Sequence, residues 1–200
     1  MKVGLFLDRD GTINEEAEYL SDPRDVHLLP GAAQAIREAN NLGLPVFIIS
    51  NQSGVARGLF SEKDVKRVNM ALLELLEKEN ASIDGIFYCP HHPDFGEPEY
   101  RKDCSCRKPK IGMLQQAGKK FKIDLKKSFV VGDKMTDVQT GNVAGARSIL
   151  VLTGYGRKEQ RLLEENDVHV DFVAEDLPEA MEFVHREMVT EQLHSHERSN

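Results

Sequence analysis

Two short acidic clusters in this sequence have the residue types needed to bind a divalent cation and to transfer a charged group. Residues 8–12 read Asp-Arg-Asp-Gly-Thr, and residues 132–137 read Gly-Asp-Lys-Met-Thr-Asp. Asp8 and Asp10 lie two residues apart, so an extended backbone aims both carboxylates the same way. Carboxylates gathered in this manner repel one another unless a cation lies between them, and such hard oxygen ligands suit Mg²⁺.

Each acidic cluster follows a short apolar run that is typical of a buried strand. Lys2–Leu7 precedes the first cluster and Ser128–Val131 precedes the second. Further strands are predicted at 45–49, 85–88, 148–152 and 172–173, and helices at 31–42, 61–80, 109–121, 136–144, 158–165 and 178–188. This alternation predicts an α/β fold with a central parallel sheet and a ligand site at the carboxyl ends of the strands. Both acidic clusters, together with Ser50 after the second strand, are therefore expected to meet at one edge.

All three cysteines fall within a short, irregular segment, residues 89–108. Cys89, Cys104 and Cys106, with one histidine, have the spacing of a closed tetrahedral Zn²⁺ site. The spacing favours His91 as the fourth ligand, with His92 as the alternative. The segment holds turn-forming residues without periodicity, so a metal would stabilise a loop that packing alone would not. Free buried cysteines and a catalytic zinc are the other interpretations. The zinc is expected to be structural because the protein fills all four positions.

Composition limits the function classes that remain. The 200 residues carry 26 Lys and Arg against 33 Asp and Glu, a formal net charge of −7, and 40% of them are hydrophobic. A net negative charge is unfavourable for sequence-independent nucleic-acid binding, and the apolar runs are too short to span a membrane. We expect one domain over residues 1–188, a polar and flexible tail over 189–200, a cytoplasmic location and a monomer.

In combination, these motifs resemble the haloacid dehalogenase (HAD) superfamily of phosphotransferases over about residues 1–185. The resemblance has four parts in order along the chain: residues 8–12, Ser50 with Asn51, Lys108, and residues 132–137. It implies a three-layer, Rossmann-like HAD fold without a large cap domain, in which a zinc-stapled loop at 89–108 covers part of the site. It also implies a Mg²⁺-dependent phosphatase.

The resemblance assigns a role to each part. Asp8 is the expected nucleophile, which forms an aspartyl-phosphate, and Asp10 is the expected general acid and base. The implied Mg²⁺ ligands are Asp8, the backbone carbonyl of Asp10, and Asp133. Ser50 and Lys108 are expected to stabilise the phosphoryl group. Asp137 is expected to support Lys134 or neighbouring Ser and Thr side chains from behind.

The zinc loop narrows the resemblance to a branch that hydrolyses heptose bisphosphates or histidinol phosphate. Residues 50–58, which read Ser-Asn-Gln-Ser-Gly-Val-Ala-Arg-Gly, are similar to the heptose group. The expected substrate is thus a heptose 1,7-bisphosphate that loses its C7 phosphate in nucleotide-activated heptose synthesis, and histidinol phosphate is the alternative. Substrate contacts are expected from Glu16, Tyr19, Asn51, Gln52, Ser53, Arg57, Arg107 and Lys134. Arg57 and Arg107 are extra cations for a distal phosphate.

Two other classes of function are disfavoured. A module that only binds a phosphorylated ligand has no need of both Asp8 and Asp10 as an acid and base. A phosphatase that processes nucleic-acid ends needs a basic groove, which the net charge of −7 does not suggest.

Overall fold

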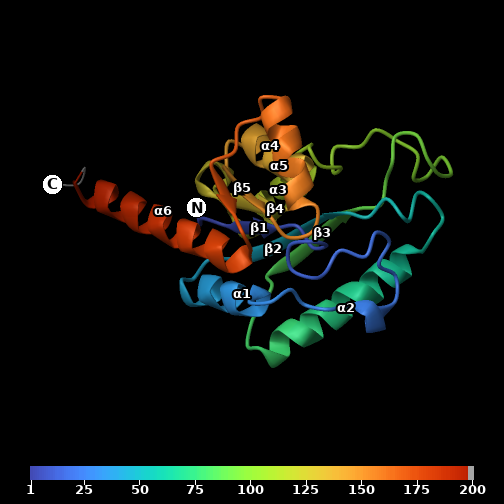
Figure 1. Ribbon diagram of the computed structural model, residues 1–200, viewed down its shortest axis with the longest axis horizontal. Coiled ribbons are helices and arrows are strands. Elements are labelled where there is room, and N and C mark those ends of the chain that lie inside the picture. Colours follow the sequence, from blue (N-terminus) through green and yellow to red (C-terminus); the bar gives the residue numbers. More distant parts are fainter. Residues whose placement is uncertain (198–200) are drawn as a thin grey trace.

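The protein is described here by a computed structural model, which covers the backbone of residues 1–197 and the side chains of residues 1–190 (Figure 1). The strands are β1 Leu5–Leu7, β2 Val46–Asn51, β3 Gly85–Cys89, β4 Phe129–Gly132, β5 Arg147–Val151 and β6 Phe172–Ala174. The helices are α1 Ala32–Asn41, α2 Glu62–Lys78, α3 Gly112–Phe121, α4 Met135–Ala144, α5 Gly156–Glu165 and α6 Leu177–Glu197, with short 3₁₀ turns η1 Pro23–Asp25 and η2 Leu125–Lys127.

The strands form one six-stranded parallel sheet in the order β3-β2-β1-β4-β5-β6, which confirms the predicted α/β architecture. The chain builds outward from β1 to β3 on one side, then crosses to β4 and builds outward to β6 on the other. Leu7 of β1 pairs in register with Val131 of β4. Asp8 therefore follows β1 beside Gly132, the last residue of β4, at the point where the strand order reverses, which is where ligands bind in such sheets.

Alternate side chains of each strand enter different cores on the two faces of the sheet. Leu5 and Leu7 of β1 are fully buried among residues of α1, α2 and α6. Phe6 points to the other face, where its ring stacks 5.1 Å from that of Phe47 and packs with α3. A smaller cluster between α4, α5 and β5 completes that face. Figure 1 shows α3, α4 and α5 on one side of the sheet and α1 and α2 on the other. The sheet is buried on both faces, as the apolar strands require.

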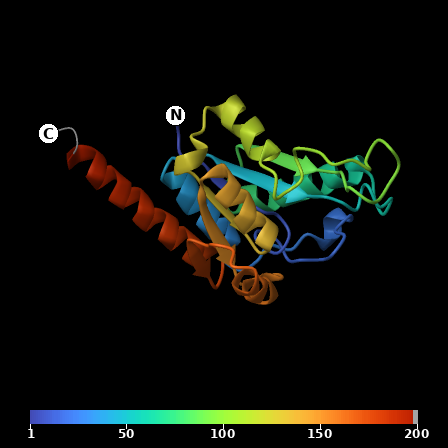
Figure 2. The ribbon, with the colours of Figure 1, turned by 90° about the horizontal axis from the view of Figure 1, so that it is seen from above.

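Three element boundaries differ by three or more residues from the sequence-based predictions, and the first is the start of β1 at Leu5 rather than Lys2. The helix predicted from residue 109 begins at Gly112, because residues 107–110 form a turn in which the Lys110 N–H bonds to the Arg107 carbonyl. The last helix, predicted to end near Met188, continues to Glu197 and extends away from the body (Figures 1 and 2). Residues 189–197 contain no Gly or Pro to stop it. The predicted polar tail is thus helical to Glu197, and 198–200 lie outside the described residues.

The longest connection between elements is the predicted metal loop, which joins β3 to α3. Within the described residues, no inserted segment forms a cap domain over the sheet. Among the described residues, no helix has both the length and the hydropathy needed to cross a bilayer.

Truncating Leu72 should test the core between α2 and the sheet. Leu72 is fully buried, so Leu72→Ala should lower the free energy of unfolding by about 2–5 kcal/mol. Met70 lies on the same helix and is 60% exposed, so Met70→Ala should change that free energy by less than about 0.5 kcal/mol. Denaturant unfolding of the two variants measures both values. Equal losses would show that the packing of α2 is misassigned.

Candidate active site

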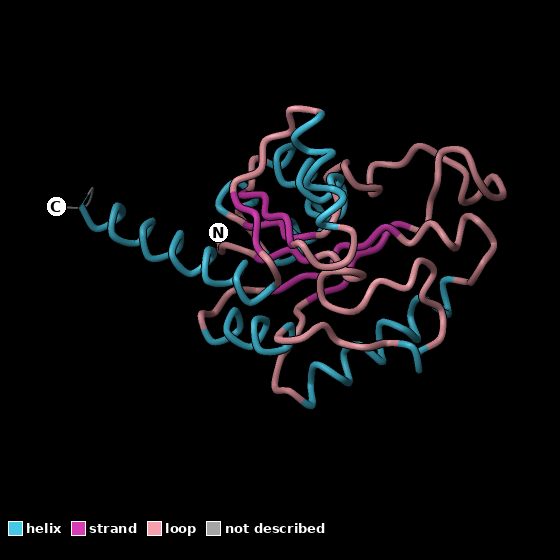
Figure 3. Tube along the Cα trace, in the orientation of Figure 1, coloured by secondary structure: helices cyan, strands magenta, loops and turns pink. Residues whose placement is uncertain are grey.

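Three carboxylates meet at the carboxyl ends of β1 and β4, as the strand register predicts. Oxygens of Asp8, Asp133 and Asp137 lie within 4.8 Å of one another, and all three side chains are buried. In Figure 3 the connecting loops gather at this end of the strands, and α6 extends on the other side of the molecule. The fold therefore brings together the two acidic clusters that are far apart in the sequence.

Asp133 is placed by an unusually close approach of two glycine backbones. Its Oδ2 accepts the backbone N–H of Tyr155 at 2.9 Å. A Cβ on Gly11 or Gly154 would lie 2.2 or 2.3 Å from the same oxygen, and both glycines have positive φ. The other oxygen, Oδ1, is buried without a hydrogen-bond donor. Burial and the neighbouring Asp8 raise the pKa of Asp133 to about 8.

Lys108 supplies the positive charge at the centre of this cluster. Its Nζ lies 2.9 Å from Asp8 Oδ1 and 2.6 Å from Asp137 Oδ1, and it donates to the Ile49 carbonyl at 2.8 Å. Burial alone would lower the pKa of Lys108, but Asp137 and Asp8 outweigh it and raise the pKa. The Asn51 side chain holds the Lys108 backbone, because it accepts the N–H and donates to the carbonyl oxygen.

Asp137 contacts Lys134, as expected from the sequence, but only through the Lys134 backbone, and its second partner is Lys108. Its Oδ1 pairs with Lys108, and its Oδ2 accepts only the backbone N–H of Lys134, at 3.1 Å. The Lys134 ammonium instead contacts Glu16 Oε2 at 2.7 Å and lies 3.7 Å from Asp133 Oδ1. The sequence could not separate these pairings, because Lys108 reaches the site from a distant loop.

The donor set that remains open fits a hard divalent cation. Asp137 Oδ1 pairs with Lys108 and Oδ2 accepts the Lys134 N–H, whereas Asp133 Oδ1 has no hydrogen-bond donor and lies 3.7 Å from the Lys134 ammonium. Lys108 and Lys134 cannot neutralise three buried carboxylates, because Lys134 is also paired with Glu16, and carboxylate oxygens are the ligands that Mg²⁺ prefers. The residues present therefore fit the Mg²⁺ implied by the sequence, with Asp8 and Asp133 as side-chain ligands.

Asp10 lies in a separate, hydrogen-bonded environment beside this cluster. Arg9 Nε and Nη2 donate to its two oxygens at 3.0 and 2.8 Å, and Asn14 and Gln52 each donate once more, at 3.0 Å. Burial by itself would raise the pKa of Asp10, but the charge and hydrogen bonds of Arg9, helped by Asn14 and Gln52, lower it. Arg9 is itself 1% exposed and also bonds Asn69 on α2 at 2.9 Å.

Sequence reasoning did not single out Arg9 or Asn14. An arginine between two aspartates reads as a surface ion pair, and only the fold shows that its guanidinium points inward to Asn69. Asn14 follows Asp10 at the spacing of a local side-chain turn, and that spacing is the one signal that could have found it.

A pocket of about 540 Å³ opens above the carboxylates. The predicted site residues on its wall are Asp8, Asp10, Glu16, Tyr19, Ser50, Asn51, Ser53, Arg107, Lys108 and Lys134. Gln52 lies behind the wall, where its side-chain amide donates to Ser50 Oγ at 2.8 Å and to Asp10. Glu18, Thr136 and Tyr155 also line the pocket, although the sequence did not identify them.

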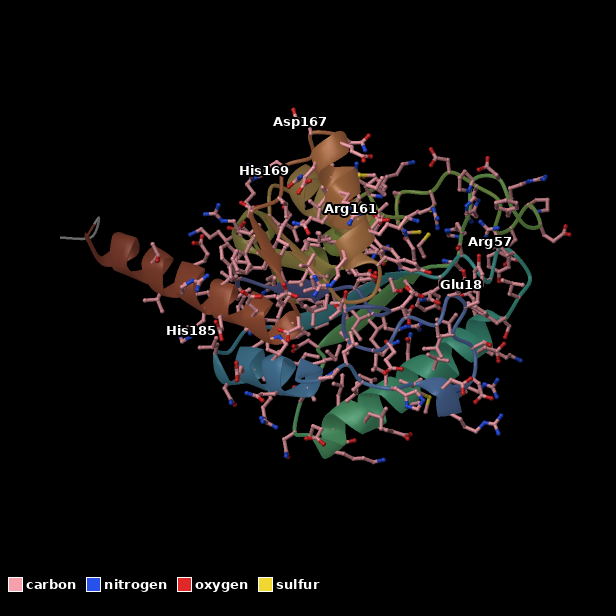
Figure 4. The ribbon with its side chains drawn as sticks, viewed as in Figure 1. Glu18, Arg57, Arg161, Asp167, His169 and His185 are labelled. Carbon is pink, nitrogen blue, oxygen red and sulfur yellow. The ribbon has the colours of Figure 1, made fainter. Side chains whose placement is uncertain are left out.

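Arg57 lines a neighbouring pocket of about 650 Å³ that shares Tyr19 with the first. Its guanidinium lies 3.9 Å from the centre of the Phe95 ring. Figure 4 shows Arg57 and Glu18 on the same side of the molecule, near the metal loop. The two arginines predicted to act together are thus divided between adjoining pockets, with Arg107 in the first.

The four predicted zinc ligands converge as the spacing requires. Ligand atoms of Cys89, His91, Cys104 and Cys106 lie within 4.8 Å of one another. His91 Nδ1 is 3.3 Å from Cys106 Sγ, whereas His92 Nδ1 accepts the backbone N–H of Asp94 at 3.1 Å. The geometry therefore selects His91 over His92. A set of three thiols and one imidazole fits Zn²⁺ and fills a tetrahedral site.

Comparisons with known proteins agree with this fold and site. A family model described as HAD-hydrolase-like matches residues 105–180. A D-glycero-D-manno-heptose-1,7-bisphosphate 7-phosphatase of Chlorobaculum tepidum is 41% identical over 88% of this chain and 91% of its own length. A D-glycero-alpha-D-manno-heptose-1,7-bisphosphate 7-phosphatase of Photorhabdus laumondii is 43% identical over 77% of this chain and 85% of its own length.

A solved structure of similar fold is that of a D,D-heptose 1,7-bisphosphate phosphatase from B. bronchiseptica, in complex with magnesium and phosphate. It has a TM-score of 0.81 and 34% identity, over 94% of this chain and 99% of that one. The fold and the clustered carboxylates define a hydrolase of the HAD class. The chain belongs to the HAD-like hydrolase family, and the relatives named above are heptose-bisphosphate phosphatases.

Replacing Asp133 should separate the cation site from the rest of the fold. Mg²⁺ should raise the melting temperature of the wild type by several degrees, because binding at 100 times its Kd adds about 2.7 kcal/mol to stability. Asp133→Asn removes a buried charge beside Asp8, so its metal-free melting temperature should be at least that of the wild type. The increase with Mg²⁺ should be lost. An Asp133→Asn variant that Mg²⁺ still stabilises would place the cation elsewhere.

Proposed function

We propose that this protein is a phosphatase that removes the C7 phosphate of D-glycero-D-manno-heptose 1,7-bisphosphate through an aspartyl-phosphate intermediate. The observation that carries the proposal is the pocket wall, on which Asp8, Asp10, Ser50 and Lys108 surround one phosphoryl position and Arg107 adds a second cation. The relatives' names point to the same sugar.

In the first step, an Asp8 oxygen attacks phosphorus and the bond from phosphorus to the sugar oxygen breaks. Asp10 delivers a proton to that departing oxygen. The phosphate dianion of an arriving substrate raises the pKa of the Asp10 carboxyl, which Arg9 otherwise holds low, and so favours the protonated acid. Ser50 and Lys108 hydrogen-bond the phosphoryl oxygens and keep them in place.

In the second step, Asp10 takes a proton from water as the water oxygen attacks the same phosphorus. The bond between phosphorus and the Asp8 oxygen breaks, which releases phosphate, restores the Asp8 carboxylate and leaves Asp10 protonated for the next turnover. Gln52 donates hydrogen bonds to both Asp10 and Ser50 Oγ. It thereby fixes the position of the general base relative to the hydroxyl that binds the phosphoryl group. Mg²⁺ bound by Asp8, Asp133 and the Asp10 carbonyl supplies neutralisation of charge on the transferring group.

A bisphosphate fits the two pockets better than a monophosphate does. Arg107 faces the catalytic pocket, and Arg57 lines the next one across Tyr19. A substrate with phosphates at both ends of a sugar can therefore place one phosphate beside Lys108 and the second beside Arg107 and Arg57. Glu16, Ser53 and Lys134 are placed to contact the sugar between them.

The proposed structural Zn²⁺ fixes the loop that carries these cations. Cys104 and Cys106 stand immediately before Arg107 and Lys108 in the chain. A metal that ties them to Cys89 on β3 limits the movement of both cations relative to the sheet.

Side-by-side hydrolysis of heptose 1,7-bisphosphate and histidinol phosphate, with Mg²⁺, tests the substrate. We expect a large preference for the bisphosphate in kcat/KM, because it alone can use both arginines. A preference for histidinol phosphate would leave the phosphatase chemistry intact and overturn the assignment of the sugar. No phosphate release from either would reject the enzymatic proposal.

Replacing the nucleophile should abolish turnover without unfolding the protein. Asp8→Asn should lower kcat by about a thousandfold or more, because an amide cannot form the acyl phosphate. The matched control is Asp25→Asn, at an exposed position on η1, and it should retain full activity. Phosphate release and melting temperature are measured for both. Full turnover by folded Asp8→Asn would disprove the covalent mechanism.

Removing zinc should act locally. A zinc-selective chelator in excess Mg²⁺ should raise the KM for the bisphosphate and speed amide hydrogen exchange over residues 89–108. Exchange in β1, β2 and β4 should stay slow, because those strands are held by the apolar cores. Unfolding of the whole chain would contradict a local role, and purified protein without zinc would contradict the metal assignment.

A further inference from the structure

The metal cluster closes the base of the loop that joins β3 to α3, but not its outer part. Cys89 and His91 begin the loop, and Cys104 and Cys106 end it. Residues 93–99 between them are exposed and belong to neither a helix nor a strand. Other contacts must therefore place this outer part relative to the pocket.

Glu62, the first residue of α2, provides such a contact from outside the loop. Its Oε1 accepts the Tyr100 hydroxyl at 3.2 Å, and its Oε2 accepts the Tyr88 hydroxyl at 2.7 Å. Tyr100 lies on the returning half of the loop, and Tyr88 precedes Cys89 on β3. A carboxylate at a helix N-terminus is favourable in itself, so one side chain joins α2, the sheet and the loop.

The tip of the loop also rests on the segment after β2. A Cβ on Gly96 would lie 2.3 Å from the Ala56 carbonyl oxygen, and Gly96 has a φ of +100°. Phe95 lies between the Arg57 guanidinium, 3.9 Å from its ring centre, and the His92 ring, 4.7 Å away. The side of Figure 4 that carries the Arg57 label is where this tip meets the body.

A chain of hydrogen bonds connects Tyr100 to the side chain of Arg107, which lines the catalytic pocket. The Tyr100 carbonyl accepts the His92 N–H at 3.0 Å, and the His92 carbonyl accepts the Lys102 N–H at 3.1 Å. The preceding carbonyl along the chain, that of His91, accepts Arg107 Nη1 at 3.1 Å. A displacement of Tyr100 therefore moves the loop segment to which the Arg107 side chain is bonded.

We infer that Glu62 is a positioning residue for substrate binding. Its carboxylate fixes Tyr100 and so holds the loop against the body with Arg107 directed into the catalytic pocket. The inference rests on the proposed function, because it assigns Arg107 to the second phosphate of the substrate. It adds a residue outside both the pocket and the metal site.

Glu62→Ala with two substrates tests the inference. The KM for heptose 1,7-bisphosphate should rise about tenfold, the loss expected of one hydrogen bond to a charged group, with kcat within about twofold. The KM for p-nitrophenyl phosphate, which offers one phosphate, should stay within about twofold. Zinc content should be unchanged. The matched control is Glu77→Ala, which removes the same charge from an exposed position on α2 and should leave both KM values unchanged.

The tyrosines show through which contact Glu62 acts. Tyr100→Phe should reproduce the rise in KM, and the double variant with Glu62→Ala should be no worse than either single variant, because both remove the same interaction. Glu62→Gln, whose amide oxygen still accepts a hydrogen bond, should restore part of the affinity. If Glu62→Ala fails to fold, Tyr100→Phe alone decides.

Three outcomes would overturn the inference. An equal rise in KM for both substrates would indicate a general structural role. A loss of zinc would make Glu62 a support of the metal site, and an effect of Tyr88→Phe without one of Tyr100→Phe would make it a support of β3. A wild type that hydrolyses neither substrate would reject the proposed function instead.

Discussion

The site depends on one constraint, which is the burial of three carboxylates that two lysines neutralise only in part. Asp8 and Asp133 follow the ends of two adjacent strands, and Asp137 lies on the first turn of α4, so the three cannot move apart without disrupting the sheet or that helix. Lys108 pairs with Asp8 and Asp137, and Lys134 lies 3.7 Å from Asp133. Burial and the negative charge that is not neutralised raise the pKa of Asp133, and one buried oxygen of Asp133 has no hydrogen-bond donor. A divalent cation would relieve both, so the Mg²⁺ site that we propose follows from the strand order rather than from one residue.

The same edge of the sheet gives two nearby aspartates different chemistry. Asp8 faces the lysine and the cation site, where a charged carboxylate is free to act as a nucleophile. Asp10 faces Arg9, which holds both of its oxygens and is in turn fixed by Asn69 on α2. In the proposed mechanism, the neighbours rather than the aspartates themselves therefore decide which residue acts as the nucleophile and which as the acid and base. The proposed two-step phosphoryl transfer in one pocket depends on this difference.

The sequence was sufficient for the parallel sheet, the meeting of the acidic clusters and the convergence of the three cysteines with His91, because each depends on spacing along the chain. It could not give the pairing of Asp137 with Lys108 or the inward direction of Arg9, because these depend on how distant segments pack. The separation of Arg57 from the catalytic pocket also depends on the packing of distant segments, because its guanidinium stacks on the ring of Phe95 at the loop tip. The extra turns of α6 were missed because a polar run can be helical as easily as frayed.

The most direct test of the division of labour is a burst experiment with Asp10→Asn and p-nitrophenyl phosphate. Nitrophenolate leaves without a proton, so the first step needs no acid, whereas the attack of water still needs a base. The account predicts a rapid release of about one nitrophenolate per enzyme, followed by a stall with a phosphoryl group on the peptide that contains Asp8. Steady turnover at the wild-type rate, or a stall with no phosphorylated peptide, would contradict it.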